Sequence, residues 1–251
     1  MNRSDEIFQN HLLDLADAAY QRGIVTFSDF MDLNELNIFH HTVQKFSYIL
    51  WDTFGGYESA ERQIAAFLPD ALCYEKKYPV ACLEIRPLNK KFSDALSHRD
   101  YLGAILNLGI ERPKLGDILV EEDRAYVFCK DNMAEFISEE LTRVRHTSVL
   151  CKQVPMGEFS YTPRTEMIRG TVASVRLDSV LALAFRSSRS SLSGWIEGGK
   201  VFVNGRAVLS NGYNLKEGDV VSARGLGKFR YLGMTAQTKK GRCYVDIEKY
   251  V

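Results

Sequence analysis

Apolar residues recur at helical spacing at the start of the chain. Residues 4–22 predict an amphipathic helix that Gly23 can end, and a second helix is expected over residues 32–44. Apolar and polar residues then alternate over residues 45–51, which is typical of a strand. We therefore expect residues 1–75 to form a small α+β domain.

The next part of the chain switches repeatedly between strand and helix patterns. The expected elements are strand 78–85, helix 97–108, strands 117–120 and 125–129, helix 133–144 and strand 148–154. Their β-α-β-β-α-β order is that of a ferredoxin-like or RRM-like sandwich. This middle domain is assigned to residues 76–156, and residues 157–168 are read as a linker before a domain at 169–251.

Residues 171–205 predict two short helices separated by a serine-rich bend, then a glycine stop and a strand. Side-chain oxygens at the start of each helix can accept its unpaired amide protons. Asn204-Gly205 is a strong signal for a hairpin turn. The expected caps are Asp178 or Ser179 for the first helix and Ser187 or Ser188 for the second.

The spacing of several short motifs in this region resembles the S4 domain, also called the α-L motif. The motifs are Arg176-Leu177-Asp178, Ser188-Arg189, Gly199-Lys200-Val201-Phe202-Val203-Asn204-Gly205 and Gly218-Asp219-Val220-Val221. The resemblance implies that the basic bend packs against the backbone of structured RNA.

Two further motifs extend the resemblance over almost the whole chain. The run H-R-D-Y-L-G-A-I-L-N-L-G-I-E-R-P-K-L-G-D-I at 98–118, and Phe54-Gly55-Gly56-Tyr57 with Glu61-Arg62, are similar to patterns of the bacterial YlmH family. This resemblance implies an α+β fold with a small N-terminal α+β domain, an RRM-like middle domain and a C-terminal S4 domain. It also implies a ribosome-associated factor that binds large-subunit complexes carrying peptidyl-tRNA when translation stalls, encoded near cell-division genes.

Charge is distributed unevenly, although the 251 residues carry no net formal charge. Residues 171–251 hold 13 Lys and Arg against 6 Asp and Glu, a net charge of +7, so residues 1–170 carry −7. This asymmetry favours a nucleic-acid-binding end on an acidic body. The alternative is that the basic face is merely solvated.

The candidate RNA contacts follow from the chemistry of phosphate recognition. Arginine can bind phosphate through two donors, lysine acts as a point charge, and hydroxyl and amide groups add hydrogen bonds. The predicted RNA-binding residues are Arg176, Asp178, Arg186, Ser187, Ser188, Arg189, Lys200, Asn204, Lys228 and Arg230. Arg224, Lys239, Lys240 and Arg242 could extend this surface.

The middle domain lacks the basic and aromatic RNP1 pattern of RNA-binding RRM sheets. Tyr126 and Phe128 share one strand face and could stack on bases, but they could equally belong to the core. The turn at 121–123 is acidic. Protein contact or a scaffolding role therefore remains open for this domain.

No motif supports catalysis, a metal or a cofactor, and we expect none of the three. His98-Arg99-Asp100 lacks the rest of the protein-kinase set and is read as a helix start capped by Ser97. There is no metal-binding His or Cys pattern, and Gly225-Leu226-Gly227 is not a dinucleotide fingerprint. The five cysteines, at 73, 82, 129, 151 and 243, favour buried thiols in a reducing compartment.

The expected partners are rRNA or tRNA, the large ribosomal subunit, and a protein bound through the N-terminal domains. No apolar run approaches the 18 residues of a membrane span, so no membrane span is expected. We expect a monomeric cytoplasmic protein. Two alternatives remain open. One is a protein-interaction adaptor linked to cell division, with RNA binding secondary. The other is an RNA-modifying enzyme of the pseudouridine-synthase kind.

Overall fold

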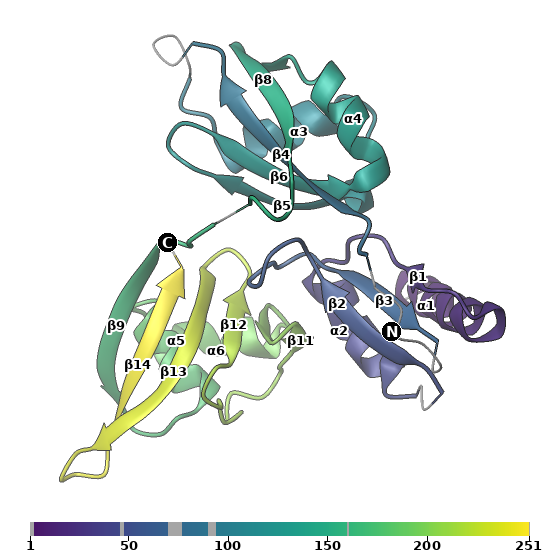
Figure 1. Cartoon of the computed structure of the whole chain (residues 1–251). Coiled ribbons are helices and arrows are strands. Elements are labelled where there is room, and N and C mark those ends of the chain that lie inside the picture. Colours follow the sequence, from purple (N-terminus) through teal and green to yellow (C-terminus); the bar gives the residue numbers. More distant parts are fainter. Residues whose placement is uncertain (1–2, 46–47, 70–76, 90–93, 160, 251) are drawn as a thin grey trace. The chain divides into compact units, whose positions relative to one another are not determined.

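The computed structural model describes residues 3–45, 48–69, 77–89, 94–159 and 161–250. The chain divides into two compact units, Met1–Tyr161 and Thr162–Val251. Both units mix helices and antiparallel strands (Figure 1). The α+β class expected from the sequence is confirmed.

The first part of unit Met1–Tyr161 consists of two helices on a small antiparallel sheet. The helices are α1 (Arg3–Arg22) and α2 (Leu33–Val43), and the strands are β1 (Thr26–Phe27), β2 (Leu50–Phe54) and β3 (Ile64–Leu68), ordered β1-β3-β2. Asp32 caps α2, because its Oδ1 accepts the amides of Asn34 and Glu35 at 2.8 and 2.9 Å. Both predicted helices are confirmed.

The strand expected over residues 45–51 is wrong in its position, because β2 begins only at Leu50. Tyr48 follows the alternation for another reason. Its ring packs against α1, and its hydroxyl donates to the Asp17 carboxylate at 2.7 Å. Phe46, assigned to the same strand, lies outside the described residues.

The rest of this unit is the expected βαββαβ sandwich with one additional short strand. Its elements are β4 (Val80–Pro87), α3 (His98–Leu106), the 3₁₀ turn η2 (Arg112–Lys114), β5 (Leu115–Val120), β6 (Ala125–Lys130), α4 (Asp131–Glu140), β7 (Arg143–Val144) and β8 (Thr147–Val154). The strand order β5-β6-β4-β8-β7 places the first and third strands at the centre. Apolar residues from one sheet face pack against α3 and α4.

The helix expected over residues 133–144 is shorter than predicted. It ends at Glu140, and Arg143 and Val144 form β7 by pairing with Ser148 and Thr147. Arg145 at the tight turn has φ 53°, so the chain reverses within two residues. The sheet edge therefore takes residues that the apolar pattern assigned to the helix.

Unit Thr162–Val251 is a six-stranded sheet covered on one face by two short helices. Its elements are β9 (Thr165–Val172), α5 (Leu177–Ala184), α6 (Arg189–Glu197), β10 (Val201–Val203), β11 (Arg206–Ala207), β12 (Val220–Ala223), β13 (Gly227–Gln237) and β14 (Cys243–Tyr250). The strand order is β11-β10-β12-β13-β14-β9. Leu181, Ile196 and Phe229, each fully buried, belong to the core between helices and sheet.

Local structure in this unit agrees with some of the sequence signals and departs from others. Asn204 and Gly205 have φ values of 49° and 76°, which makes the β10–β11 connection the predicted hairpin turn. β9 starts at Thr165, inside the segment read as a linker. The cap predicted for the first helix is wrong: α5 begins one residue earlier, at Leu177, and Arg176 occupies the cap position without a side-chain cap bond.

Candidate RNA-binding site

The α5–α6 pair brings two predicted site arginines onto one buried carboxylate. Asp178 is 4% exposed, and its Oδ2 accepts a hydrogen bond from Arg189 Nε at 3.1 Å, with Arg189 Nη2 also bound to it. Arg176 Nε lies 3.5 Å from Asp178 Oδ1, and Ser179 Oγ donates to the same oxygen at 3.2 Å. Asp178 is therefore a buried carboxylate that holds Arg176 and Arg189 from the core side.

Arg186 occupies the bend between the two helices in an unusual backbone conformation. Its φ is 50°, in the left-handed region that costs a non-glycine residue about 1–2 kcal/mol. Its side chain is 77% exposed, and Nη2 lies 2.6 Å from the exposed Glu166 carboxylate. The strained conformation projects one cation away from the core at the point where the chain reverses.

The serines of the bend are used to start α6. Ser188 is its N-cap, as predicted, and Ser188 Oγ accepts the Ser191 amide at 3.1 Å. Ser187 Oγ lies 2.9 Å from Ser191 Oγ. Both Ser187 and Ser188 are exposed, so their hydroxyls can exchange these bonds for bonds to a phosphate.

Cations lie over aromatic rings at four places in this unit, and one of these rings, Phe185, is at the bend. The four pairs, with distances from the cation to the ring centroid, are Lys200 over Trp195 at 5.1 Å, Arg224 over Phe202 at 5.3 Å, Lys228 over Tyr250 at 4.7 Å and Lys249 over Phe185 at 5.3 Å. Cations interleaved with aromatic rings suit both phosphates and bases. Of these cations, only Lys249 was missed in the sequence interpretation.

The signal for Lys249 was present in the alternation of β14. Val245 and Ile247 are fully buried on the face covered by the helices, and Lys249 continues this face one step beyond the core. Its ammonium group therefore reaches the Phe185 ring at the bend. Placing it there required knowing that β14 pairs with β9, where Lys249 lies opposite Glu166.

Two predicted residues lie apart from this group. Asn204 serves the fold, because its Nδ2 donates to Asp219 Oδ1 at 2.8 Å and its Oδ1 accepts the Val220 amide at 2.9 Å. Arg230 lies opposite Glu248 on the strand face that alternates with buried Phe229. Of the other predicted residues, Arg176, Asp178 and Arg189 meet in one cluster, and Arg186, Ser187 and Ser188 form the bend beside it. Lys200 and Lys228 lie over Trp195 and Tyr250.

The middle-domain sheet does not present the open aromatic surface of an RNA-binding RRM. Phe128 is fully buried, with the Tyr57 ring stacked at 5.2 Å and the Phe159 ring edge-on at 5.1 Å. Phe30 and Ile64 from the N-terminal part pack against the same cluster. Phe128 could have stacked on bases or belonged to the core, and the structure places it in the core.

A carboxylate on β5 joins this sheet to the loop after β2. Asp117 accepts from the Tyr57 hydroxyl and the Glu61 amide, each at 2.7 Å, and from the Arg62 amide at 3.1 Å. Burial and the Asp117 charge raise the pKa of Tyr57, so the phenol keeps its proton. Burial, reinforced by the nearby Arg62, lowers the pKa of Arg112 to about 10. The F-G-G-Y, E-R and G-D-I motifs are thus structural contacts between the two parts of the unit.

The H-R-D segment has the expected role at a helix start. Asp100 Oδ2 accepts the Ser97 amide at 2.8 Å and the Ser97 hydroxyl at 2.7 Å. These bonds lower the pKa of Asp100, which also faces Arg145 at 3.6 Å. The geometry is that of a capping box.

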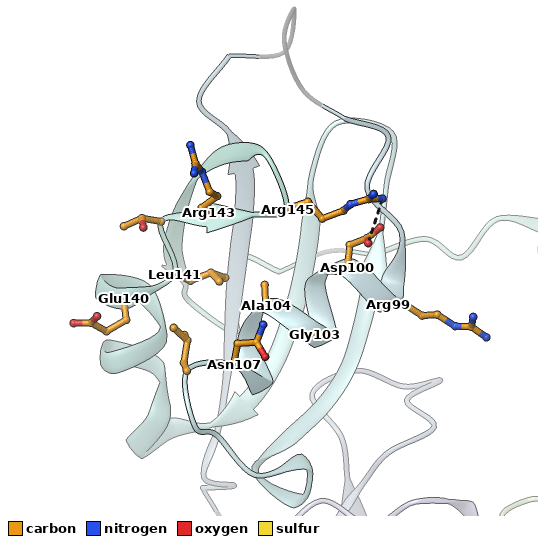
Figure 2. Close-up of a pocket in the computed structure, with 11 residues that line it drawn as sticks. Arg99, Asp100, Gly103, Ala104, Asn107, Glu140, Leu141, Arg143 and Arg145 are labelled. Carbon is orange, nitrogen blue, oxygen red and sulfur yellow. Dashed lines mark ion pairs between the residues drawn. The ribbon is translucent and has the colours of Figure 1, made fainter.

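A pocket of about 520 Å³ lies between α3, the end of α4 and β7. Figure 2 shows Arg145 directed at Asp100, while the Arg99 and Glu140 side chains point away from the pocket's centre. Its charged lining carries both signs and has no nucleophile paired with a base. The described residues also include no group of three or more potential metal ligands, and no described helix is long and apolar enough to cross a membrane.

Two family models match the chain. One, described as "Putative RNA-binding domain in YlmH", matches residues 74–158, and the S4 domain model matches residues 175–221. With the two-helix bend on its sheet, these matches define the chain as an RNA-binding protein of the S4-domain class.

A curated relative and a solved structure narrow the identification. The chain is 30% identical over 199 residues to the ribosome-associated protein quality control protein P2 of Bacillus subtilis (strain 168), covering 78% of this chain and 76% of that relative. Cell division protein ylmH from Streptococcus pneumoniae has the same fold, with a TM-score of 0.52 and 21% identity over 63% of this chain and 95% of that chain. The chain belongs to the YlmH family.

Proposed function

We propose that this protein binds structured RNA on the ribosome through the α5–α6 bend and the cations around it. The observation that carries the proposal is the projection of Arg186 from a left-handed backbone position beside the anchored Arg189. Arg186 and Arg189 supply forked donors, and Lys200 and Lys249 add point charges. We assign the site a contact role, in which its cations bind the phosphates of the RNA.

The RNA proposed is rRNA or tRNA on large-subunit complexes that carry peptidyl-tRNA, bound when translation stalls. The name of the Bacillus subtilis relative supports a place in ribosome-associated quality control. The net charge of +7 on residues 171–251 supports attraction to a polyanion. The acidic unit Met1–Tyr161, whose RRM-like sheet is covered, is proposed to orient the protein or contact a protein partner.

Arg186→Gly tests the site without disturbing the fold. Glycine relieves the left-handed strain of about 1–2 kcal/mol, while its greater freedom in the unfolded chain costs about 0.5–1 kcal/mol. The free energy of unfolding should therefore stay within about 1 kcal/mol. Affinity for purified bacterial large ribosomal subunits should fall at least about 5-fold, since one arginine–phosphate contact is lost.

Arg145→Gly is the matched control. Arg145 belongs to unit Met1–Tyr161, has φ 53°, and has an exposed side chain 3.6 Å from the acidic residue Asp100. The variant removes the same charge from the same backbone conformation, so it should leave ribosome affinity unchanged. Equal loss in both variants would point to nonspecific charge effects. Unchanged binding by Arg186→Gly together with Lys200→Gln would refute the bend as the binding site.

A further inference from the structure

The hairpin formed by β13 and β14 extends beyond the part of the sheet that the helices cover. Met234 to Gln237 are all exposed, and so are Lys239, Lys240 and Arg242 at the tip. We call residues 234–244 the arm. The arm contains three cations and no carboxylate, so its charge is +3. Figure 1 shows this hairpin projecting from the end of the sheet.

The tip of the arm is held in one conformation by several hydrogen bonds. The Thr238 amide donates to Arg242 O at 2.8 Å, the Gly241 amide donates to Thr238 O at 2.9 Å, and the Arg242 amide donates to Thr238 Oγ1 at 2.9 Å. Arg242 Nη2 also donates to Thr171 O at 2.7 Å, which fixes the tip to β9. An ordered loop loses less conformational entropy on binding than a loose one.

The arm also exposes large apolar side chains beside its cations. Tyr244 is 46% exposed and Met234 is 55% exposed. Tyr244 lies between Ala236 on β13 and Thr171 on β9, whose small side chains leave its ring uncovered. Neither side chain belongs to the core cluster of the unit. An exposed aromatic ring among cations is the arrangement by which proteins stack on unpaired bases while holding the phosphates.

We infer that the arm is a second RNA-contact point of this unit, separate from the bend, with Tyr244 stacking on an unpaired base and Lys239 and Lys240 binding the flanking phosphates. Its charge of +3 without a carboxylate favours RNA over a protein surface as the partner. The inference rests on the proposed RNA binding of the unit, but not on the role of the bend.

The register of the strands separates the two contact points. At the end near the bend, Glu166, which pairs with Arg186, lies opposite Lys249. At the end near the arm, Val172 lies opposite Cys243. Six residue steps along β14 separate these positions, which corresponds to about 20 Å. A single RNA segment that contacts both ends must therefore span about 20 Å.

The test compares charge-reversed variants of the full-length chain on two probes, bacterial large ribosomal subunits and the protein-free rRNA extracted from them. Lys239→Glu with Lys240→Glu should weaken binding to both probes about 10-fold or more, and should flatten the slope of log affinity against log salt by up to about two units. The matched control is Arg206→Glu with Lys216→Glu, two exposed cations of the same unit with the same change of charge. The control should retain most of the affinity.

Variants of Tyr244 separate the contribution of base stacking from that of charge. Tyr244→Ala should weaken rRNA binding between about 5- and 100-fold with an unchanged salt slope, whereas Tyr244→Phe, which keeps the ring, should bind as the parent does. Weakening by Tyr244→Phe equal to that by Tyr244→Ala would overturn the stacking role. Circular dichroism of each variant checks that the sheet is intact.

The outcomes for the arm and the bend are independent. If the arm variants weaken binding and Arg186→Gly does not, the arm stands and the bend proposal fails. If only Arg186→Gly weakens binding, the arm inference is overturned. Loss on ribosomal subunits without loss on protein-free rRNA would also overturn it, because the partner of the arm would then be a ribosomal protein.

Discussion

Arg189 holds the buried carboxylate of Asp178, with Nε 3.1 Å from Oδ2. The Asp178 side chain is 6% exposed and the Arg189 side chain 52% exposed, so the pair faces the core on one side and solvent on the other. A guanidinium has five N–H donors, and the carboxylate uses only those on one edge. Arg189 can therefore stabilise the fold and still offer donors to RNA.

Replacing Arg189 with Ala should lower the free energy of unfolding of unit Thr162–Val251 by about 2 kcal/mol. The reason is that Asp178 would remain buried with a single cation near it, Arg176 at 3.5 Å. A charge reversal such as Arg189→Glu should be more damaging, since it places two carboxylates together. Changes at Arg189 thus affect both stability and binding, whereas changes at Arg186 test binding alone.

The measurement is urea unfolding monitored by the fluorescence of Trp195. Trp51 and Trp195 are the two tryptophans of the chain, so a Trp51→Phe background makes the signal specific for this unit. Arg186→Ala is the control and should change stability by less than about 0.5 kcal/mol, because its ion pair is exposed. An effect of Arg189→Ala no larger than this control would show that Asp178 does not need its partner.

Gly56→Ala should destabilise unit Met1–Tyr161 by about 3 kcal/mol or more, through overpacking and backbone strain. A Cβ at Gly56 would lie 2.2 Å from Phe128 Cδ1, and Gly56 has φ 103°. Gly23→Ala is the control, since Gly23 has φ 64° but no atom within 4 Å of such a Cβ. It should cost only about 1–2 kcal/mol. Trp51 fluorescence in a Trp195→Phe background measures the unfolding of both variants. An equal loss of unfolding free energy in the two would contradict the close packing of Gly56 against Phe128.

Alkaline pH should weaken the contact between Tyr57 and Asp117. Burial and Asp117 raise the pKa of Tyr57 above its ordinary value, whereas the unfolded chain releases this proton near pH 10. The stability from Tyr57 is therefore complete below pH 10 and is lost above it, by up to about 1.4 kcal/mol per pH unit. The Tyr57→Phe variant should not lose this stability above pH 10, although it should be less stable than the parent protein at pH 7.

The check is urea unfolding at pH 7, 10 and 11 for both proteins. The other tyrosines titrate in both, so the difference between the two proteins isolates Tyr57. Parallel stability curves would mean that the phenol is not held protonated in the native unit.

The cysteines of the middle domain should resist alkylation in the native protein. Burial raises the pKa of Cys82 and Cys129 to about 12 and that of Cys151 to about 11, so the reactive thiolate is scarce at pH 8. Cys243 is only half-buried and should react before these three. Peptide mass spectrometry after brief iodoacetamide treatment measures each site, and labelling of Cys82 as fast as Cys243 would contradict the described packing.

Local signals in the sequence were reliable where a single interaction sets the conformation. Ser188 capping α6, the Asn204-Gly205 turn and the βαββαβ order were all predictable, because caps, turns and periodicity act over a few residues. The errors arose where distant partners decide. Tyr48 alternates like a strand residue but packs on α1, and Val144 joined a sheet edge instead of continuing a helix.

The bend from Phe185 to Arg189 was recognisable from sequence as the candidate RNA-binding site, since its cations and serines lie close together in the chain. The separate roles of these residues could not be predicted from the sequence. Tertiary structure makes Asp178 the buried anchor of Arg189, leaves Arg186 exposed, and brings Lys249 to the bend through the pairing of β14 with β9. The motifs of the YlmH family were readable in the same way, but only folding shows that Tyr57 and Asp117 meet. Burial and long-range pairing decide these roles, because they depend on residues that lie far apart in the sequence.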